Sequence, residues 1–321
     1  MTEKTPMKHI DLHMHTTHSD GSYKPRELVR YAKQKKLDCI SVTDHDTMSS
    51  FDECAEEAKK ERIELIPGIE ISAQFEPGTL HILGYFLDRN NLQLKAALED
   101  IQKARRERNP QIIEKLNKLG IPITFEEVVA ESGGKQIGRP HFAKVLLKKG
   151  VVKDLQEAFD KFLGKGKSAY LDKRRLSPKE SIRRIREAGG IAVIAHPKQM
   201  RLDEEKLTQE FARLVDEGLG GIEAYNSCQN REEAQIYKRL AKRFNLLITG
   251  GSDFHGANKP DVDLGWLGDG VELGYEVVDR MRQSLRGLPP KAAGRSPDAR
   301  SESGVRTNKE SFNRPCHRLR R

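Results

Sequence analysis

Residues 11–15 of the chain are Asp11-Leu12-His13-Met14-His15. A β-strand directs alternate side chains to opposite faces, so the aspartate and both histidines would share one face, with Leu12 and Met14 on the other. A single inward histidine is usually a hydrogen-bonded core residue. Two histidines at i and i+2 beside a carboxylate favour a metal site, because neutral imidazoles are good ligands. We therefore predict that the first strand carries metal ligands.

The same residue types recur at the edges of later predicted strands. These clusters are Thr43-Asp44-His45-Asp46, Gly68-Ile69-Glu70, His81, Ala195-His196-Pro197 and Ser252-Asp253-Phe254-His255. In an α/β barrel the carboxyl ends of the strands share one rim, so residues distant in sequence converge there. Imidazole and carboxylate ligands without thiolate suit Mn, Fe or Zn in a catalytic rather than a structural site.

Short β-branched runs alternate with charged helical patterns, which is typical of repeated βα units. The predicted strands are His9–His15, Cys39–Asp44, Glu64–Ile71, Leu80–Phe86, Gly190–Ala195, Gly221–Tyr225 and Leu246–Gly250. The helical patterns between them are Pro25–Lys36, Phe51–Arg62, Pro178–Ala188, Glu204–Glu217 and Arg231–Phe244. Seven strands with intervening helices predict a barrel-like α/β body.

Two segments depart from this pattern and divide the chain. Residues 91–173 carry four consecutive helical patterns without a convincing strand, which predicts a helical insertion. Residues 287–321 are rich in Pro, Ser, Arg and Gly and poor in apolar residues, which predicts a disordered basic tail. The barrel would then comprise residues 8–90 and 174–286.

Charge is unevenly distributed along the 321 residues. The chain has 57 Lys and Arg against 48 Asp and Glu, a net charge of +9, but residues 286–321 contain ten basic and three acidic residues. The body is therefore nearly neutral, and the tail could be a nucleic-acid arm or, as we favour, a solvated terminus. No apolar run approaches the roughly 18 residues of a membrane helix. The polar start and four cysteines without paired spacing predict a soluble cytoplasmic protein without disulfides.

Together these motifs resemble those of the polymerase and histidinol phosphatase (PHP) superfamily of metal-dependent phosphoesterases, over roughly residues 8–275. The resemblance implies a distorted seven-stranded (β/α)7 barrel with three divalent transition metals at its rim, Mn being the first expectation and Fe or Zn the alternatives. The implied ligands are His13, His15, Glu70 and Asp253 for one metal, Glu70, His81 and His196 for a second, and Asp20, His45 and His255 for the third.

The insertion resembles one branch of this superfamily, whose members act on nucleoside 3′,5′-bisphosphates and in some cases trim short RNA from its 5′ end. The resemblance is carried by Gly138-Arg139-Pro140-His141-Phe142, in which Pro140 stands where the family motif has threonine. A second segment contributes Arg105, Arg106 and Arg108. Arginine forks bind phosphate in a bidentate manner. The resemblance implies these substrate contacts: Arg105, Arg106, Arg108, Arg139, His141 and His255.

The implied reaction removes the 3′-phosphate of adenosine 3′,5′-bisphosphate, with Glu70, His196, Asp253 and His255 as the catalytic residues. The implied partners are therefore a small phosphorylated nucleotide and short RNA, with no membrane and no obligate protein partner. A histidinol-phosphate phosphatase is the nearest alternative, although the arginine clusters favour a substrate with two phosphates. A noncatalytic PHP binding module is the other alternative, and the complete ligand set argues against it.

Overall fold

The computed structural model describes residues 9–132, 137–172, 174–268, 271 and 273–287. The strands are β1 (His9–Met14), β2 (Leu37–Val42), β3 (Glu64–Leu65), β4 (Gly68–Ala73), β5 (Leu80–Tyr85), β6 (Ile191–Ile194), β7 (Gly221–Asn226) and β8 (Leu247–Gly251). The α-helices are α1 (Pro25–Gln34), α2 (Phe51–Glu61), α3 (Leu92–Lys118), α4 (Phe125–Ser132), α5 (Arg139–Lys148), α6 (Leu155–Ala158), α7 (Pro178–Glu187), α8 (Glu204–Asp216), α9 (Arg231–Phe244) and α10 (Glu276–Arg286). Short helical turns are η1 (Phe159–Leu163), η2 (Pro197–Met200) and η3 (Gly256–Asn258).

The mixed α/β class is as predicted, but the described residues form eight strands in two sheets rather than seven strands. The predicted strand Glu64–Ile71 divides at Pro67, which has no N–H to donate to a neighbouring strand. Its first part, β3, completes the sheet β1-β2-β3, and its second part, β4, begins the sheet β4-β5-β6-β7-β8. Helix α10 is an additional element that the sequence patterns did not indicate.

Strand direction determines which ends share an edge. The neighbours β1-β2, β2-β3, β6-β7 and β7-β8 are parallel, whereas β5 is antiparallel to both β4 and β6. Consequently, the first residues of β5 lie beside the last residues of β4, and His81 pairs with Ser72. Isolated bridges join the two sheets, between His45 and Glu70 and between Met14 and Phe254.

Strands β1 and β8 approach closely where the two sheets meet. A Cβ atom added to Gly251 would lie 2.3 Å from the Cβ atom of His13, closer than real Cβ contacts allow. Only glycine therefore permits the end of β8 to lie against β1 at this point. The loop that follows β8 is thereby held beside the histidines of β1.

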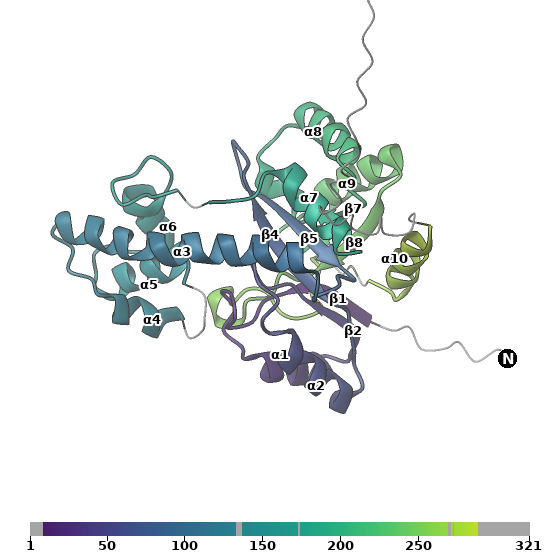
Figure 1. Ribbon diagram of the computed structural model, residues 1–321, viewed down its shortest axis with the longest axis horizontal. Coiled ribbons are helices and arrows are strands. Elements are labelled where there is room, and N and C mark those ends of the chain that lie inside the picture. The colour runs from purple at the N-terminus through teal and green to yellow at the C-terminus, as the bar shows by residue number, and fades with distance from the viewer. Residues whose placement is uncertain (1–8, 133–136, 173, 269–270, 272, 288–321) are drawn as a thin grey trace, which may run out of the picture. The chain divides into compact units, whose positions relative to one another are not determined.

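Helix α3 connects two hydrophobic cores (Figure 1). Its first half packs Leu94 and Leu98 into a core shared with β4, β5, β6 and the helices α7 to α9. Its second half packs Ile112 and Leu116 into a separate core formed with α4, α5 and α6. The described part of residues 91–173 is therefore helical, and it belongs to the same compact unit as the two sheets.

Of the other two cores, one lies beneath α10 and contains Leu12, and the other lies between the first sheet and helices α1 and α2 and contains Met14. Among the helices that the structure describes, none is long and apolar enough to cross a membrane. The predicted tail, from residue 288 onward, lies outside the described residues.

Candidate active site

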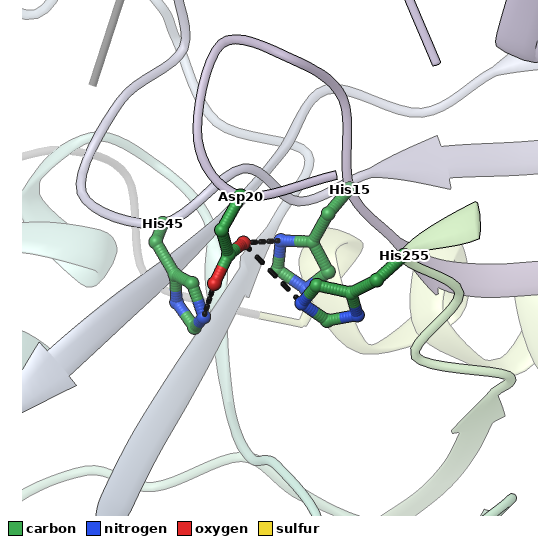
Figure 2. A group of neighbouring side chains, drawn as sticks. All are labelled: His15, Asp20, His45 and His255. Carbon is green, nitrogen blue, oxygen red and sulfur yellow. Dashed lines mark ion pairs between the residues drawn. The ribbon is translucent and has the colours of Figure 1, made fainter. Parts of the chain in front are cut away.

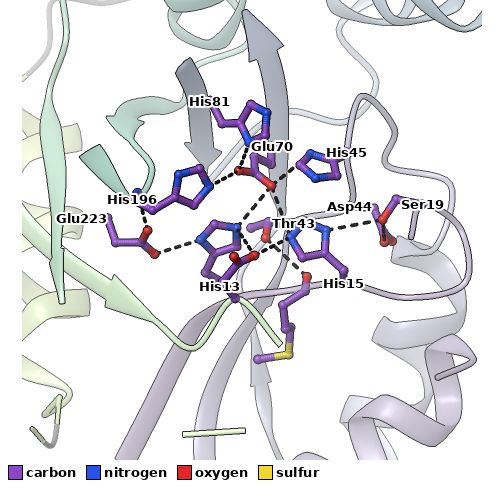
Figure 3. Close-up of polar contacts among 12 residues, drawn as sticks. His13, His15, Ser19, Thr43, Asp44, His45, Glu70, His81, His196 and Glu223 are labelled. Carbon is purple, nitrogen blue, oxygen red and sulfur yellow. Dashed lines mark hydrogen bonds and ion pairs between the residues drawn. The ribbon is translucent and has the colours of Figure 1, made fainter. Parts of the chain in front are cut away.

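Loops and strand ends between residues 13 and 255 bring nine histidine and carboxylate side chains together, most of which are labelled in Figures 2 and 3. We call this set the ligand cluster. Its members are His13, His15, Asp20, His45, Glu70, His81, His196, Asp253 and His255. All nine were implied by the family resemblance, and the structure places every one of them at the edge where the two sheets meet.

Glu70 lies at the centre of this cluster, fully buried in β4. The ring nitrogens nearest its two oxygens belong to His81 (2.8 Å), His45 (3.0 Å), His196 (3.0 Å), His13 (3.2 Å) and His15 (3.2 Å). A carboxylate surrounded in this way can bridge two cations. The resemblance implied this role for Glu70.

Asp20 forms a second focus on the loop between β1 and α1 (Figure 2). Its carboxylate oxygens lie 3.3 Å from His255 Nε2, 3.6 Å from His45 Nε2 and 3.7 Å from His15 Nδ1. The Ser-Asp-Gly turn alone gave little reason to expect a ligand here. The fold supplies one because the backbone N–H of Gly21 donates to the carbonyl of Thr16, which turns the loop back over β1.

Asp253 is the third carboxylate, on the loop after β8. Its Oδ1 lies 3.2 Å from His15 Nε2 and 3.3 Å from His13 Nε2. Its Oδ2 accepts a hydrogen bond of 3.0 Å from Lys259 Nζ. Lys259 was not expected from the sequence, because an isolated lysine six residues beyond a motif carries no signal.

The donor set fits divalent cations. Ring nitrogens of His13, His15 and His45, together with an oxygen of Glu70 and of Asp20, are buried without a hydrogen-bond partner. Buried polar atoms are nearly always paired, so a group of unpaired ligand atoms pointing at one another indicates a site for cations. Three such groups occur among the described residues: His13, His15, Glu70 and Asp253; His15, Asp20, His45 and His255; and His45, Glu70 and His81.

The first of these groups has the membership implied by the resemblance. The second has one member more, His15. In the third, His45 stands where His196 was expected, although His196 Nε2 lies 3.0 Å from the Glu70 oxygen that also faces His81. The metal assigned to each histidine therefore stays a proposal, while the proximity of all nine side chains is a feature of the structure.

The histidines and carboxylates of the cluster shift one another's pKa values. Burial alone would lower the pKa of His15, but Asp253 and Glu70 raise it to about 10. Burial opposes ionisation of Glu70 and Asp253, yet the surrounding histidines hold the pKa of both carboxyls well below the usual range. Burial, with His15 and His81 nearby, lowers the pKa of His45 to about 3. Carboxylates kept ionised beside a neutral imidazole are suited to bind cations.

Two further carboxylates orient the ligands. Glu223 on β7 lies 2.9 Å from His13 Nδ1 and accepts a hydrogen bond of 2.7 Å from the backbone N–H of His196 (Figure 3). Asp44 accepts hydrogen bonds from Ser19 Oγ at 2.7 Å and from the N–H of Thr16 at 2.8 Å. Such outer partners fix the orientation of ligand rings and increase metal affinity. Glu223 was missed in the sequence because its strand, Gly221–Tyr225, contains no histidine beside it.

Asp11 and His9, which share the face of β1 with the two ligands, serve the backbone instead. Asp11 accepts hydrogen bonds from the N–H groups of Ser252 (2.9 Å) and Gly265 (2.8 Å), which ties β1 to the loop after β8. His9 begins the strand, and its N–H donates to Asp38. Neither residue belongs to the ligand groups.

Two members of the ligand cluster have an unfavourable backbone conformation. His196 has φ of 26° and Asp253 has φ of 56°, both in the left-handed region that favours glycine. Non-glycine residues there cost about 1–3 kcal/mol each and concentrate at functional sites. Both residues follow a strand by two positions, so the local strain turns their side chains back into the cluster.

A cavity of about 200 Å³ adjoins the cluster, and we call it the arginine cavity. It shares Asp20 and His45 with the ligand cluster, and its opposite wall comes from α3 and α5. The remaining lining residues are Ser19, Ser72, Arg105, Arg108, Gly138, Arg139, Pro140, His141 and Phe159. Of the predicted substrate contacts, Arg105, Arg108, Arg139 and His141 therefore face one space.

Arg106 lies outside this space. Arg105 and Arg108 are three residues apart on α3 and share one buried face, whereas Arg106 is exposed to solvent and does not line the cavity. His255, which was also expected to contact substrate, lines a different cavity. The sequence alone could not distinguish these positions because the helix phase relative to the sheet was unknown.

The cavity arginines differ in how their charges are compensated. Arg105 pairs with Asp46 at 2.5 Å, and the carboxylate of Asp46 also accepts from the N–H of Ser72 at 2.9 Å. Arg108 donates only to the neutral side chain of Asn109 and makes no ion pair with the described residues. Burial, together with Arg105 and Arg139, lowers the pKa of Arg108 to about 9. A buried guanidinium without a carboxylate partner calls for an anionic ligand.

His141 is held in one orientation at the junction of the two spaces. Its Nδ1 accepts a hydrogen bond of 3.0 Å from the backbone N–H of Gly138, so Nε2 carries the proton of the neutral ring. Burial, with Lys144 and Arg105 nearby, lowers the pKa of His141 to about 4. The ring is therefore a neutral hydrogen-bond donor near pH 7. Pro140 occupies the first turn of α5, where its missing N–H is not needed.

A second cavity, of about 310 Å³, also adjoins the cluster, and we call it the lysine cavity. It is lined by Asp20, His45, His81, Pro140, His141, Lys144, Leu155, His196, Gln199, Asp253, His255, Asn258 and Lys259. The two cavities thus meet at Asp20, His45, Pro140 and His141. Each offers positive charge beside the ligand cluster.

The comparisons with known proteins agree with this chemistry. The model of the PHP domain matches residues 11–220 of the chain. A 5′-3′ exoribonuclease of Haemophilus influenzae is 35% identical over 272 residues, covering 85% of this chain and 96% of that protein. A 3′,5′-nucleoside bisphosphate phosphatase of Chromobacterium violaceum is 31% identical over 264 residues, covering 82% of this chain and 93% of the relative.

Among solved structures, one described as that of a metal-dependent phosphoesterase from Bifidobacterium adolescentis superposes with a TM-score of 0.76. It is 30% identical, and the match covers 89% of this chain and 99% of the other.

Proposed function

Because the chain belongs to the PHP domain family and is a hydrolase acting on phosphate esters, we propose that it removes the 3′-phosphate of nucleoside 3′,5′-bisphosphates. Adenosine 3′,5′-bisphosphate would give AMP and phosphate. The same site would release nucleotides from the 5′ end of short RNA. The names of the bisphosphate phosphatase and exoribonuclease relatives support both activities.

The observation that carries this proposal is the arginine cavity beside the ligand cluster. The buried Arg108, which no carboxylate of the described residues compensates, lines the same cavity as Asp20 and His45. A substrate with two phosphates could place one at the cluster and the other among the guanidinium groups. A monophosphate would leave Arg108 without an anion.

We propose that the cluster holds three divalent transition metals, with manganese as the first candidate. His13, His15, Glu70 and Asp253 would hold one, and the remaining members of the cluster would hold the others in the groups described above. Such ions supply charge neutralisation at the phosphate and lower the pKa of bound water.

The chain's own residues would then orient the substrate. Arg108 and Arg139 would bind the phosphate that does not react, and Nε2–H of His141 would donate to it or to the ribose. Arg139 is preorganised because its guanidinium lies 5.1 Å from the centre of the Tyr170 ring and donates to the carbonyl of Leu163 at 3.1 Å. Glu223 would keep the His13 ring in its tautomer.

We interpret the two sheets as halves of the distorted barrel expected for the family. The bridges between His45 and Glu70 and between Met14 and Phe254 support this interpretation, because they connect the sheets at both seams. In such a barrel the ligand cluster would occupy the rim, where the active sites of barrel enzymes lie.

Substitution of Arg108 tests the proposal. Steady-state kinetics would compare adenosine 3′,5′-bisphosphate with adenosine 3′-monophosphate and histidinol phosphate. Loss of a charge-assisted hydrogen bond costs about 1.5–3 kcal/mol, so Arg108→Ala should reduce the preference for the bisphosphate about tenfold or more. Arg106→Ala, two residues away but exposed, is the matched control and should leave that preference unchanged.

If Arg108→Ala lowers kcat/KM equally on the bisphosphate and the monophosphate, the arginine cavity does not determine which substrate is preferred. Faster turnover of histidinol phosphate than of the bisphosphate by the unmodified protein would favour the histidinol-phosphate alternative. If Arg106→Ala reduces the preference for the bisphosphate, Arg106 contacts the substrate, as the resemblance implied.

A further inference from the structure

The lysine cavity lies where a longer substrate would have to continue. The arginine cavity is bounded by α3 and α5, and only Asp20 and His45 of the ligand cluster line it. The lysine cavity, in contrast, is lined by these two and by His81, His196, Asp253 and His255. A group bound at the cluster would therefore contact the lysine cavity over more of its surface than the arginine cavity.

We infer that the lysine cavity receives the nucleotide on the 3′ side of the reacting phosphate, and that Lys144 binds the next phosphate along the strand. This inference rests on the proposed function, since it assumes a reacting phosphate at the cluster and a 5′-phosphate among the arginines. A phosphodiester carries a second nucleoside on its reacting phosphorus, and that nucleoside needs space. At about 310 Å³ the lysine cavity lies at the lower end of the roughly 300–1,000 Å³ range of ligand pockets.

The bond changes follow from this placement. Hydrolysis would break the bond between phosphorus and the 3′ oxygen of the first nucleoside, with the hydroxyl of water joining phosphorus and a proton reaching the 3′ oxygen. The first nucleotide would leave as its 5′-monophosphate. The shortened strand would keep the phosphate as its new 5′-phosphate and could move into the arginine cavity for the next cycle.

Lys144 is suited to bind a phosphate because its charge is available. It makes no ion pair with the described residues, and its ammonium group donates to the side-chain oxygen of Asn258. Asn258 in turn donates to the backbone carbonyl of Asp20 at 2.7 Å, so the lysine is linked to the loop of a cluster residue. Lys259, the other lysine of this cavity, is already paired with Asp253.

Lys148 offers a matched control on the same helix. It lies one turn beyond Lys144 on α5, its side chain is 67% exposed, and it pairs with Glu131 outside the cavity. Replacing either lysine with glutamine removes the same charge from the same helix. Of the two, only Lys144 lines the lysine cavity.

The test compares Lys144→Gln and Lys148→Gln on adenosine 3′,5′-bisphosphate and on the 5′-phosphorylated trinucleotide pApApA. Lys144→Gln should lower kcat/KM on the trinucleotide about tenfold more than on the bisphosphate, as expected for one charge-assisted hydrogen bond. Lys148→Gln should leave the ratio of the two unchanged. Equal losses on both substrates, no loss, or the same loss in Lys148→Gln would overturn the inference.

A binding measurement provides a second readout. Calorimetry would use a trinucleotide in which methylene replaces the first bridging 3′ oxygen, and Lys144→Gln should raise its Kd about tenfold. An unchanged Kd would contradict the inference. If the unmodified protein hydrolyses the bisphosphate but not pApApA, this inference fails and the phosphatase proposal stands. If it hydrolyses neither, the proposed function itself fails.

Discussion

The ligand cluster and the arginine cavity share a wall but are built in different ways. The cluster comes from strands and the loops that immediately follow them, with Glu70 at its centre and outer carboxylates such as Glu223 holding its rings. The cavity arginines come from two helices that pack in a core of their own, through residues such as Leu116 and Phe142. Under the proposed function, the sheets would hold the groups that perform the reaction, and α3 and α5 would hold those that choose the substrate.

The largest expected effect is on the cluster. Glu70→Gln removes the charge around which five ring nitrogens gather. Bound metal and turnover of every phosphate ester should fall together, by about a hundredfold or more in activity, since loss of even an outer partner of a metal ligand costs 10–100-fold. Metal analysis of the purified variant, with exhaustive chelation of the unmodified protein alongside, checks this.

Glu114→Gln on α3 is a control for that change, because the ion-pair partner of Glu114 among the described residues is the exposed Lys118. It should retain metal and activity. Full activity of the chelated protein, or of a Glu70→Gln variant without metal, would rule out a metal-dependent reaction at the cluster.

A smaller effect on the same region is expected for Glu223→Gln. The amide keeps the shape of the side chain but removes the charge that faces His13 Nδ1. Metal affinity should fall about 10–100-fold, and kcat/KM at saturating metal should recover on bisphosphate and monophosphate alike. Metal titrations monitored by activity measure both. A loss that excess metal cannot restore would mean that Glu223 acts on the substrate or on folding instead.

The smallest expected effect is in the arginine cavity. Tyr170→Leu removes the ring beneath the Arg139 guanidinium, an interaction worth about 0.5–1 kcal/mol at partly exposed sites. The preference for bisphosphate over monophosphate should fall about threefold, with bound metal unchanged. Tyr170→Phe keeps the aromatic face and should behave like the unmodified protein. If both variants lose the preference, the hydroxyl and its contact with Asp172 matter more than the ring.

The two regions also differ in how far the sequence predicted them. The period of two in β1 and the recurrence of histidines after later strands predicted a group of converging side chains, and the family resemblance added Asp20; the structure brings these residues together. Asp46 and Glu223 were not identified as partners of Arg105 and His13, since they act through contacts between distant elements. The division of one predicted strand at Pro67 changed the strand number without moving Glu70 away from the cluster.

The helical insertion was predicted as helices, but the faces of those helices were not. Arg105, Arg106 and Arg108 are the same type of residue on one helix. The packing of α3 shows that Arg106 faces solvent. Lys144 had no motif to mark it, and its place beside Asn258 depends on how α5 meets the loop after β8. Such contacts are set by tertiary packing, which local sequence patterns do not contain.

The most direct test of the account is a side-by-side measurement of kcat/KM for Glu70→Gln and Arg108→Ala on adenosine 3′,5′-bisphosphate and adenosine 3′-monophosphate. If the cluster performs the reaction and the arginine cavity selects the substrate, Glu70→Gln will lower both values by the same factor. Arg108→Ala will lower the bisphosphate value about tenfold more than the other. Equal losses in Arg108→Ala, or a substrate-dependent loss in Glu70→Gln, would contradict the division of labour between the two regions.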